Sequence, residues 1–481
     1  MTTLLLSLDV GTSGVRAALF DDSCKEVNGV RIARDVESFT DFTELDPDQI
    51  VGEVIEAIDE LLTTISDADR IEVISISAFW HSLLGIDSSG ALTTPLLTWA
   101  DTRATAIAKR FRTEFKEREI HVRTGCRFHS SYWPAKLRWL QTEHAEAFSR
   151  TSLWLGFAEY LCLRLFEQPL ASISMASATG LMNQKTCDWD WQLVEALNVR
   201  RDTLPEITRN INLQLSDQYS TRWPALAQAR LKVVVGDGAA NNVGGGCSSK
   251  NHIALMVGTS GAMRVVFAGE PPAELPSSLW SYRIDDRRVV VGGALSDGGG
   301  LYRWLLQSLK LDEKPEELVN EIAPDAHGLT LLPFWSGERS TGWSGDARGA
   351  ILGLTQQTRP VDIVRAAYEA IAYRFALIAR ALETIVPNAA IVATGNALRS
   401  SPVWLQIISD VLGRQLILGG SSEASIRGAA LLGLEAVGKI GSIEENVVEA
   451  DEVFEPSMDR HAVYSQAIER QEMFYCKLVS E

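Results

Sequence analysis

The sequence predicts a two-lobed α/β protein, with a mixed sheet flanked by helices in each lobe. Short β-type runs alternate with helical patterns along most of the 481 residues, which is typical of this fold class. The turn Gly-Thr-Ser-Gly occurs at 11–14 and again at 258–261, with apolar runs on both sides and an arginine shortly after each copy. No long Pro/Ser-rich linker divides the chain, so we expect lobes at 1–246 and 247–481 that pack directly on each other.

The first half has the pattern strand, strand, helix, strand. The runs 4–10 and 15–21 flank the first turn and are expected to form a hairpin. A helix begins after Asp46, which is a good N-cap, and Gln49 is placed to close a capping box. This helix after Asp46 has apolar residues at helical spacing, namely Ile50, Val54, Ile58, Leu61 and Ile65. The run 71–79 is expected to form the next strand.

The second half alternates more regularly between strands and helices. Several runs rich in Val, Ile and Leu end in turns that carry glycine, which indicates strands. Longer amphipathic stretches between them indicate helices. The expected strands are 231–238, 252–261, 287–300, 389–395 and 414–418, and the expected helices are 301–309, 361–386, 402–412 and 425–438.

The charge and the cysteines narrow the class of protein. There are 45 Lys and Arg residues against 62 Asp and Glu residues, a net charge of −17, which argues against a general nucleic-acid or acidic-membrane binder. No apolar stretch approaches the roughly 18 residues that span a bilayer, and the N-terminus lacks the basic region of a signal peptide. The six cysteines show neither a C-x-x-C pair nor zinc-ligand spacing, so we expect buried, reduced thiols. These features predict a cytoplasmic protein with a small-molecule partner, and they leave the oligomeric state open, a homodimer included.

Each Gly-Thr-Ser-Gly turn suits a phosphate group. Glycine lets the backbone approach closely and present its N–H groups, and Thr and Ser add hydroxyl donors. A single turn of this kind is more often part of an ordinary hairpin, but two copies, one in each lobe, favour a nucleotide held in the cleft between the lobes. The sequence has no G-x-x-x-x-G-K-[ST] motif and no G-x-G-x-x-G fingerprint between a strand and a helix, so neither a P-loop nor a dinucleotide fold is expected.

Two aspartates lie where predicted strands end, which is where ligands of open α/β sheets collect. Asp9 directly precedes the first turn, where a carboxylate could hold magnesium through its water ligands. Asp237 lies among small residues at 235–242, and a carboxylate there could accept the proton of an attacking hydroxyl. From the residues alone, an Asp between two glycines is more often a turn former.

Eight segments then occur in one order along the chain: 9–16 (DVGTSGVR), 99–103 (WADTR), 236–240 (GDGAA), 257–261 (VGTSG), 292–299 (GGALSDGG), 337–341 (GERST), 348–354 (RGAILGL) and 423–430 (EASIRGAA). In this combination they resemble the FGGY family of carbohydrate kinases, which belongs to the actin/hexokinase/Hsp70-like (ribonuclease H-like) two-lobed ATPases. The resemblance covers nearly the whole chain. It implies ATP-dependent phosphorylation of a sugar or polyol hydroxyl in the cleft between the lobes.

The resemblance also implies how ATP and Mg²⁺ are held. Asp237 matches the general base, and Asp9 matches the carboxylate on the magnesium side. At Asn396 the sequence departs from the family, which usually has another glycine there; this puts the pose of the adenine in question but not the use of ATP. The matching nucleotide positions are Gly11, Thr12, Ser13 and Arg16 in the first lobe, and Gly258, Thr259, Gly299, Arg303, Gly395, Asn396 and Ser400 in the second.

The matching substrate positions are Trp80, His81, Trp99, Asp101 and Arg103, together with Asp237. From the residues alone, His81 after an apolar run is more often a core or helix-capping residue. Asp101 and Arg103 are as readily explained by a surface salt bridge. Relatives that act on glycerol carry Arg-Glu in place of Trp80 and His81, so glycerol is not expected.

The expected substrate is D-gluconate, giving 6-phosphogluconate, because the Trp-Ala-Asp-Thr-Arg string resembles the gluconate kinases. Xylulose kinases often have Met-His at the Trp80 position, and xylulose or another ketopentose is the alternative. The carboxylate of gluconate needs a cation, for which Arg103, Arg127 and Lys136 are candidates. Two further alternatives are a sugar-binding regulator and an actin-like ATPase. A regulator would lack the general base, and an actin-like ATPase would not need the substrate motifs at 80–81 and 99–103.

Overall fold

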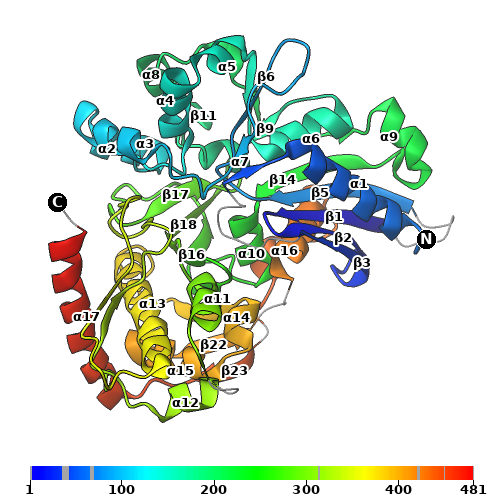
Figure 1. Cartoon of the computed structure of the whole chain (residues 1–481). Helices are drawn as coiled ribbons and strands as arrows, with labels where there is room; N and C mark the ends of the chain where they lie inside the picture. The colour runs from blue at the N-terminus through cyan, green and yellow to red at the C-terminus, as the bar shows by residue number, and fades with distance from the viewer. Residues whose placement is uncertain are drawn as a thin grey trace.

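The computed structural model describes residues 3–34, 43–65, 70–311, 315–419, 423–448 and 450–479. Two large sheets, of six and seven strands, form the centres of two lobes. Figure 1 shows the first lobe in blue and the second in green to red, with a group of smaller helices above them. The mixed α/β, two-lobed architecture expected from the sequence is confirmed.

The first sheet has a hairpin on one side and parallel strands on the other. β1 and β2 are antiparallel, as are β2 and β3, whereas β1 pairs parallel with β5 and β5 pairs parallel with β14. In sheet order, the strands are β13 (Leu213–Gln214), β14 (Arg230–Gly236), β5 (Arg70–Ala78), β1 (Thr3–Gly11), β2 (Gly14–Phe20) and β3 (Glu26–Ala33).

The second sheet repeats this pairing. β15 and β16 form the antiparallel hairpin, β16 pairs antiparallel with β18, and β15 pairs parallel with β21, which pairs parallel with β22. The short repeat in the sequence is therefore part of a repeated sheet topology. In sheet order, the strands are β17 (Trp280–Arg283), β18 (Arg288–Leu295), β16 (Gly261–Ala268), β15 (His252–Val257), β21 (Ala390–Thr394), β22 (Leu416–Gly419) and β23 (Ala450–Phe454).

Two helices pack closely where the lobes meet. α10 (Asp237–Gly244) contacts α16 (Ala424–Ala436), and α16 also packs on β1, β5 and β14 of the first sheet. The helices approach this closely because Gly428 faces the backbone of Ala240, where any side chain at 428 would overlap the Ala240 carbonyl. A helix from the last part of the chain thus completes the core of the first lobe.

The other helices cover the sheets or form a cap. α1 (Pro47–Leu62) packs on β2 and β3, and α13 (Pro360–Glu383) packs on β16 and β18. A separate buried core lies in the cap, within residues 83–204. The cap contains α2 (Thr105–Glu114), α3 (Glu117–Thr124), α4 (Trp133–Glu143), α5 (Ala145–Arg150), α7 (Ile173–Ser177) and α8 (Trp191–Ala196). The helix α6 (Phe157–Phe166) instead packs into the core of the first lobe. The second lobe adds α11 (Gly299–Ser308), α12 (Pro315–Glu321), α14 (Asn396–Arg399), α15 (Pro402–Leu412) and α17 (Met458–Leu478).

Two local expectations are wrong. Asp46 does cap α1 by accepting from the backbone N–H groups of Asp48 and Gln49, but the Gln49 side chain donates to Glu53 instead of closing a capping box. Five cysteines are buried as expected, whereas Cys476 is exposed because it lies on the outer side of α17. Within the described residues, no helix is both long and apolar enough to cross a membrane.

Candidate active site

The predicted catalytic side chains lie at the carboxyl ends of three neighbouring parallel strands. Asp9 is near the end of β1, the segment with Trp80 and His81 follows β5, and Asp237 follows β14. The register pairs Asp9 with Ser77 and Gly236 with Ala78, so these ends meet at one edge of the first sheet. This is the edge where open α/β sheets bind ligands.

Asp9 is a poorly hydrated carboxylate beside a second one. The Ser77 hydroxyl donates to its Oδ1 at 2.7 Å. Burial raises the pKa of Asp9 to about 7, with further contributions from the negative charges of Asp237 and Glu423, while Arg16 opposes the shift. Two neighbouring carboxylates with few cations close to Asp9 are the oxygen donor set that Mg²⁺ prefers. The residues therefore fit a divalent cation.

Asp237 begins α10 and accepts a hydrogen bond from the Gly238 backbone N–H at 2.7 Å. Burial raises its pKa, and the positive charges of Arg264 and Arg339 oppose the rise. The Trp80 ring lies directly on this turn, since a Cβ atom at Gly236 or Gly238 would overlap the indole. The two glycines thus let the bulky Trp80 ring approach Asp237, which is a physical reason for small residues in this turn.

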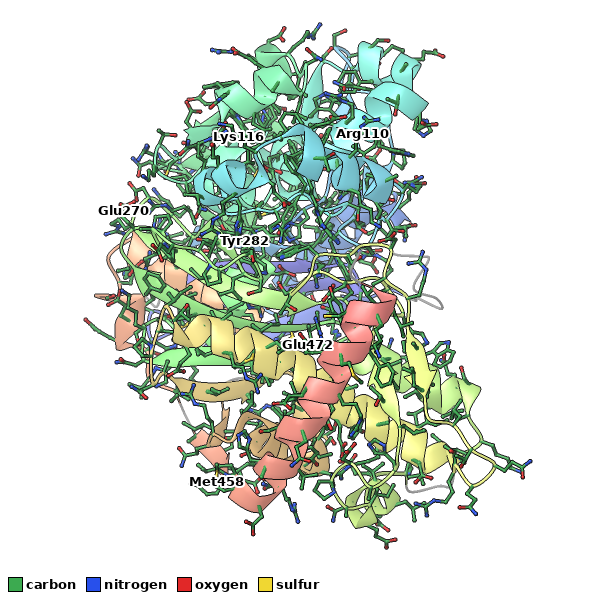
Figure 2. The ribbon with its side chains drawn as sticks, turned by 90° about the vertical axis from the view of Figure 1, so that its left-hand side faces the viewer. Arg110, Lys116, Glu270, Tyr282, Met458 and Glu472 are labelled. Atoms are coloured by element: carbon green, nitrogen blue, oxygen red, sulfur yellow. The ribbon has the colours of Figure 1, made fainter. Side chains whose placement is uncertain are left out.

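His81 is a buried residue with aromatic neighbours, and the charges of Arg339 and Lys136 act on it. Its Nδ1–H donates to the Ala178 carbonyl at 2.7 Å, which leaves Nε2 unprotonated as an acceptor. Burial lowers the pKa of His81 to about 3. Tyr132 and Tyr282 lie 5.1 and 5.7 Å from its ring, and their hydroxyls hydrogen-bond at 2.6 Å. Figure 2 shows Tyr282 where the helices of the cap meet the second lobe, so this contact joins the two.

Asp101 and Arg103 form a salt bridge with each other, which is one of the two interpretations left open by the sequence. Arg103 donates from Nε and Nη2 to both Asp101 oxygens, at 3.0 and 2.7 Å, and pairs with Glu44 at 2.6 Å. Its guanidinium also lies 4.5 Å from the ring of Trp139. The positive charge of Arg103 is therefore already neutralised.

The other two cations considered for a substrate carboxylate are also engaged. Arg127 pairs with Glu117 at 2.5 Å. Lys136 is buried and donates to the backbone carbonyls of His81 and Thr98, at 2.7 Å each, and burial lowers its pKa to about 7. Lys136 therefore links the backbone at His81 to the backbone at Thr98, next to Trp99. Its position in the sequence does not reveal this structural role.

Two arginines that were not among the predicted site residues stand near Asp237. Arg264 lies on β16, and Arg339 lies in the loop at 337–341, 4.8 Å above the ring of Trp99. Both sequence segments carried a signal: Arg264 is the arginine that follows the second Gly-Thr-Ser-Gly turn, and Arg339 is part of the GERST segment. Neither motif indicated that the guanidinium of its arginine would lie near Asp237.

The first phosphate turn is held by arginines. Arg34, just after β3, donates to the carbonyls of Gly11 and Thr12, at 3.2 and 2.6 Å. Ser13 at the tip is exposed. Arg16, expected to contact the transferred phosphate, pairs with Glu26 and Glu423, at 2.7 and 2.9 Å. In this structure two carboxylates therefore hold the Arg16 guanidinium.

The structure also brings together the predicted nucleotide residues of the second lobe. The backbone N–H of Gly299 donates to the Gly258 carbonyl at 2.8 Å, and those of Gly298 and Gly300 donate to Thr259 at 3.0 Å. A Cβ atom at any of these three glycines would lie 2.7–2.9 Å from the turn backbone, so only glycine allows α11 to begin here.

The remaining predicted nucleotide positions surround this contact. Gly395 has a φ of +95° and packs on the Val257 carbonyl at the end of β15. Arg303 is exposed on α11, one turn beyond Gly299. Ser400 donates to the Ala397 carbonyl at 3.2 Å. Asn396 begins α14, and its side chain lies outside the described residues.

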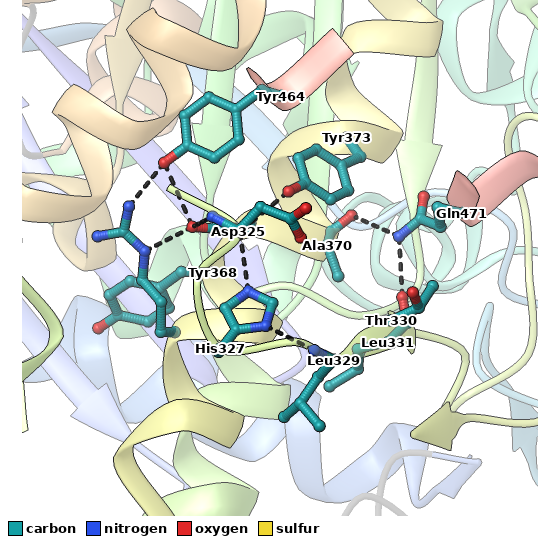
Figure 3. A network of polar contacts seen from close by, with 12 residues as sticks. Asp325, His327, Leu329, Thr330, Leu331, Tyr368, Ala370, Tyr373, Tyr464 and Gln471 are labelled. Carbon is teal, nitrogen blue, oxygen red and sulfur yellow. Dashed lines mark hydrogen bonds and ion pairs between the residues drawn. The ribbon is translucent and has the colours of Figure 1, made fainter. Parts of the chain in front are cut away.

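A second cluster of possible metal ligands lies far from this site, at the C-terminal helix. Asp325, His327 and Glu369 have ligand atoms within 4.8 Å of one another. Figure 3 shows His327 accepting a hydrogen bond from the backbone N–H of Leu329. His327 also donates to Glu369 at 2.9 Å, and two residues of α17 contact the carboxylates: Tyr464 donates to Glu369 at 3.3 Å and Arg470 donates to Asp325 at 2.9 Å. Arg365 neutralises Glu369 at 2.6 Å. This cluster therefore holds α13 and α17 together, and a cation would have to displace its hydrogen bonds.

Comparison with known proteins covers both lobes. Residues 4–244 match the N-terminal domain of the FGGY family of carbohydrate kinases, and residues 253–437 match its C-terminal domain. The chain is 30% identical to the gluconokinase of Bacillus subtilis (strain 168) over 467 residues, which are 92% of this chain and 90% of that protein. The solved gluconate kinase of Lactobacillus acidophilus is 28% identical, with a TM-score of 0.89 over 99% of this chain and 98% of that one. The same values hold for a ligand-bound xylulose kinase from Lactobacillus acidophilus.

Proposed function

The chain belongs to the FGGY family of carbohydrate kinases, and we propose that it transfers the γ-phosphoryl group of ATP to the 6-hydroxyl of D-gluconate. The products are 6-phosphogluconate and ADP. The observation that carries the proposal is the position of Asp237 at the carboxyl end of β14, near Asp9 and near two arginines that form no ion pair with a described residue.

In this proposal Asp237 is the general base. Its carboxylate accepts the proton of the 6-hydroxyl as that oxygen forms its bond to the γ-phosphorus and the bond to the β-γ bridging oxygen breaks. Arg264 and Arg339 favour the ionised form of Asp237, which this step requires. Trp80, packed on Gly236 and Gly238, restricts how far the carboxylate can move.

The phosphates are bound by backbone groups of both lobes. The N–H groups of the turns at 11–14 and 257–261 are the donors, and α11 begins directly against the second turn. Asp9, with Asp237 beside it, would hold Mg²⁺, which neutralises charge on the phosphates. We propose that the two turns face each other across one nucleotide.

The acceptor lies on the aromatic side of Asp237. His81 Nε2 is available to accept from a sugar hydroxyl, and Trp99, Tyr132 and Tyr282 provide flat apolar surface. A ketopentose such as xylulose is a second candidate, because a solved xylulose kinase overlaps this chain as well as a gluconate kinase does. The gluconokinase of Bacillus subtilis and the two unneutralised arginines favour the acid.

The test is an ADP-release assay with D-gluconate, D-xylulose, D-ribulose and glycerol, with the phosphorylated product identified by mass spectrometry. Gluconate is expected to give the highest kcat/KM and glycerol the lowest. Asp237→Asn is the matched control, because it keeps the shape of the side chain and should lower kcat by about 10²–10⁴. ADP release that needs no acceptor would indicate an ATPase, and xylulose exceeding gluconate tenfold would indicate a ketopentose kinase.

A further inference from the structure

Arg264 is a buried cation that forms no direct ion pair with any described residue. Five arginines of the described chain are buried, and four of them pair with a carboxylate. Arg264 is 5% exposed and pairs with none. A buried charge without a partner is costly, so an anion bound beside Arg264 would stabilise it. The four paired arginines are Arg283, Arg288, Arg365 and Arg374.

The Arg264 side chain is nevertheless held in place. Its Nε donates to Asn242 Oδ1 at 3.1 Å, and Asn242 Nδ2 donates back to the Arg264 carbonyl at 3.0 Å. Asn242 lies on α10, the helix that Asp237 begins. The Nη2 atom of Arg264 is buried and has no hydrogen-bond partner in the described structure. One nitrogen thus orients the guanidinium, and another is left with an unused donor.

Arg339 also has a guanidinium nitrogen without a hydrogen-bond partner in the described part of the chain. Its Nη2 donates to the Leu295 carbonyl at 3.1 Å, while its buried Nε has no partner among the described residues. The adjacent carboxylate, Glu338, does not neutralise it, because Arg374 and Tyr475 bind Glu338 at 2.5 and 2.6 Å. Among the described residues neither guanidinium therefore has a direct ion pair, and Asp237 is the one carboxylate whose charge acts on both.

Both guanidiniums lie beside residues that the sequence assigns to the acceptor or its base: Arg264 packs on Gly238, where a Cβ atom would lie 2.5 Å from its Nη1, and Arg339 lies 4.8 Å from the ring of Trp99. They are the main positive charges that act on Asp237, and Arg339 also acts on His81. The main charges that act on Asp9, on the magnesium side, are different ones: Asp237, Glu423 and Arg16. The charges of the two arginines therefore act on Asp237, whereas Arg16 is the cation that acts on Asp9.

We infer that Arg264 and Arg339 together bind the carboxylate of an aldonic acid, and that this contact selects acids over neutral polyols of the same length. The inference rests on the proposed function. Charge-assisted hydrogen bonds from two guanidiniums to one carboxylate would satisfy the free Nη2 and Nε atoms. This pair of arginines takes the place of the three cations that the sequence suggested for the carboxylate. Arg103 and Arg127 already form salt bridges, and Lys136 already donates to backbone carbonyls.

The experiment compares D-gluconate with D-sorbitol, which has the same hydroxyl configuration but a CH₂OH group in place of the carboxylate. The variants are Arg264→Gln, Arg264→Lys and Arg339→Gln, and Arg127→Gln is the matched control because Glu117 already neutralises that arginine. For wild type and variants we would measure kcat/KM with both acceptors, and the binding of both to the nucleotide-free enzyme by calorimetry.

Arg264→Gln and Arg339→Gln should each lower the gluconate-to-sorbitol ratio of kcat/KM by about 10²–10³-fold, the loss typical of one partner of a buried charge pair. The ratio for Arg264→Lys should lie between the ratios for Arg264→Gln and wild type, and Arg127→Gln should leave the ratio unchanged. Because the ratio compares two acceptors in one variant, a general loss of folded enzyme does not alter it. An equal fall for both acceptors would overturn the inference, since it would assign the arginines to Asp237 or to the phosphoryl group.

Binding separates this inference from the proposed function. Preferential binding of gluconate that is lost in Arg264→Gln, without phosphorylation of gluconate by the wild type, would support the carboxylate contact and refute the proposed reaction. Phosphorylation of gluconate with an unchanged ratio in both arginine variants would refute the contact alone. A wild type that binds gluconate no better than sorbitol would refute the contact.

Discussion

Asp9→Asn should make the nucleotide-free protein more stable and abolish its activity. Burial raises the pKa of Asp9 from 3.8 to about 7. Each pKa unit corresponds to about 1.4 kcal/mol, so keeping this carboxylate ionised at pH 8 costs about 4 kcal/mol of folding free energy. Asparagine can still accept from Ser77, but its amide N–H groups need partners, which reduces the expected net gain to about 2–3 kcal/mol.

The pH dependence of this gain has a defined sign. The folded protein holds the Asp9 proton more tightly than the unfolded chain does, so wild-type stability decreases as pH rises from about 4 to about 7. The variant lacks this decrease. Its advantage over wild type should therefore be largest at pH 8 and smaller at pH 5, by about 2–3 kcal/mol.

The assay is thermal unfolding at pH 5 and pH 8 without nucleotide or Mg²⁺. Asp59→Asn is a control of opposite sign, because hydrogen bonds from Arg222 and Trp223 lower the pKa of Asp59. That pairing stabilises the fold above the unfolded pKa, so its loss should lower the melting temperature at pH 8. The reasoning about Asp9 is refuted if Asp9→Asn melts below wild type at pH 8, or if its advantage is the same at both pH values.

Three further predictions concern the base, its neighbouring ring and the C-terminal helix. Because burial raises the pKa of both Asp9 and Asp237 and both must be ionised, kcat/KM should fall with decreasing pH below about pH 7, measured from pH 5.5 to 9. Gly236→Ala should displace the Trp80 ring, lower stability by about 1–3 kcal/mol in thermal unfolding and reduce kcat more than the affinity for ATP. Glu369→Ala should leave a buried arginine unpaired, lower stability by about 3–5 kcal/mol and increase hydrogen exchange in α17.

Much of the fold follows from local patterns in the sequence. The strand predicted at 4–10 is β1 (Thr3–Gly11), the helix predicted at 402–412 is α15 (Pro402–Leu412), and the repeated turns lie in hairpins of the same topology. These elements could be predicted because glycine turns, N-caps and apolar spacing act within a few residues of the chain. The meeting of Asp9 and Asp237 at one sheet edge also follows, because parallel strands present their carboxyl ends together.

The tertiary structure alone decides which charges remain available. Arg103, Arg127 and Lys136 were candidates as cations close to the substrate strings in sequence, yet each is neutralised or hydrogen-bonded by a group from elsewhere in the chain. Arg264 and Arg339 are 75 residues apart in sequence and stand beside one base.

The tertiary structure alone also decides where α16 packs. This helix lies in the second half of the chain, yet it completes the first lobe through contacts with β1, β5 and β14. A periodic pattern in the sequence predicts that a helix forms and which of its faces is apolar, but not which sheet will cover that face. The sequence therefore determined the elements, the repeat and the meeting of Asp9 and Asp237 at one sheet edge. The partner of each buried charge depends on distance and burial between remote segments, and only the packed chain sets these.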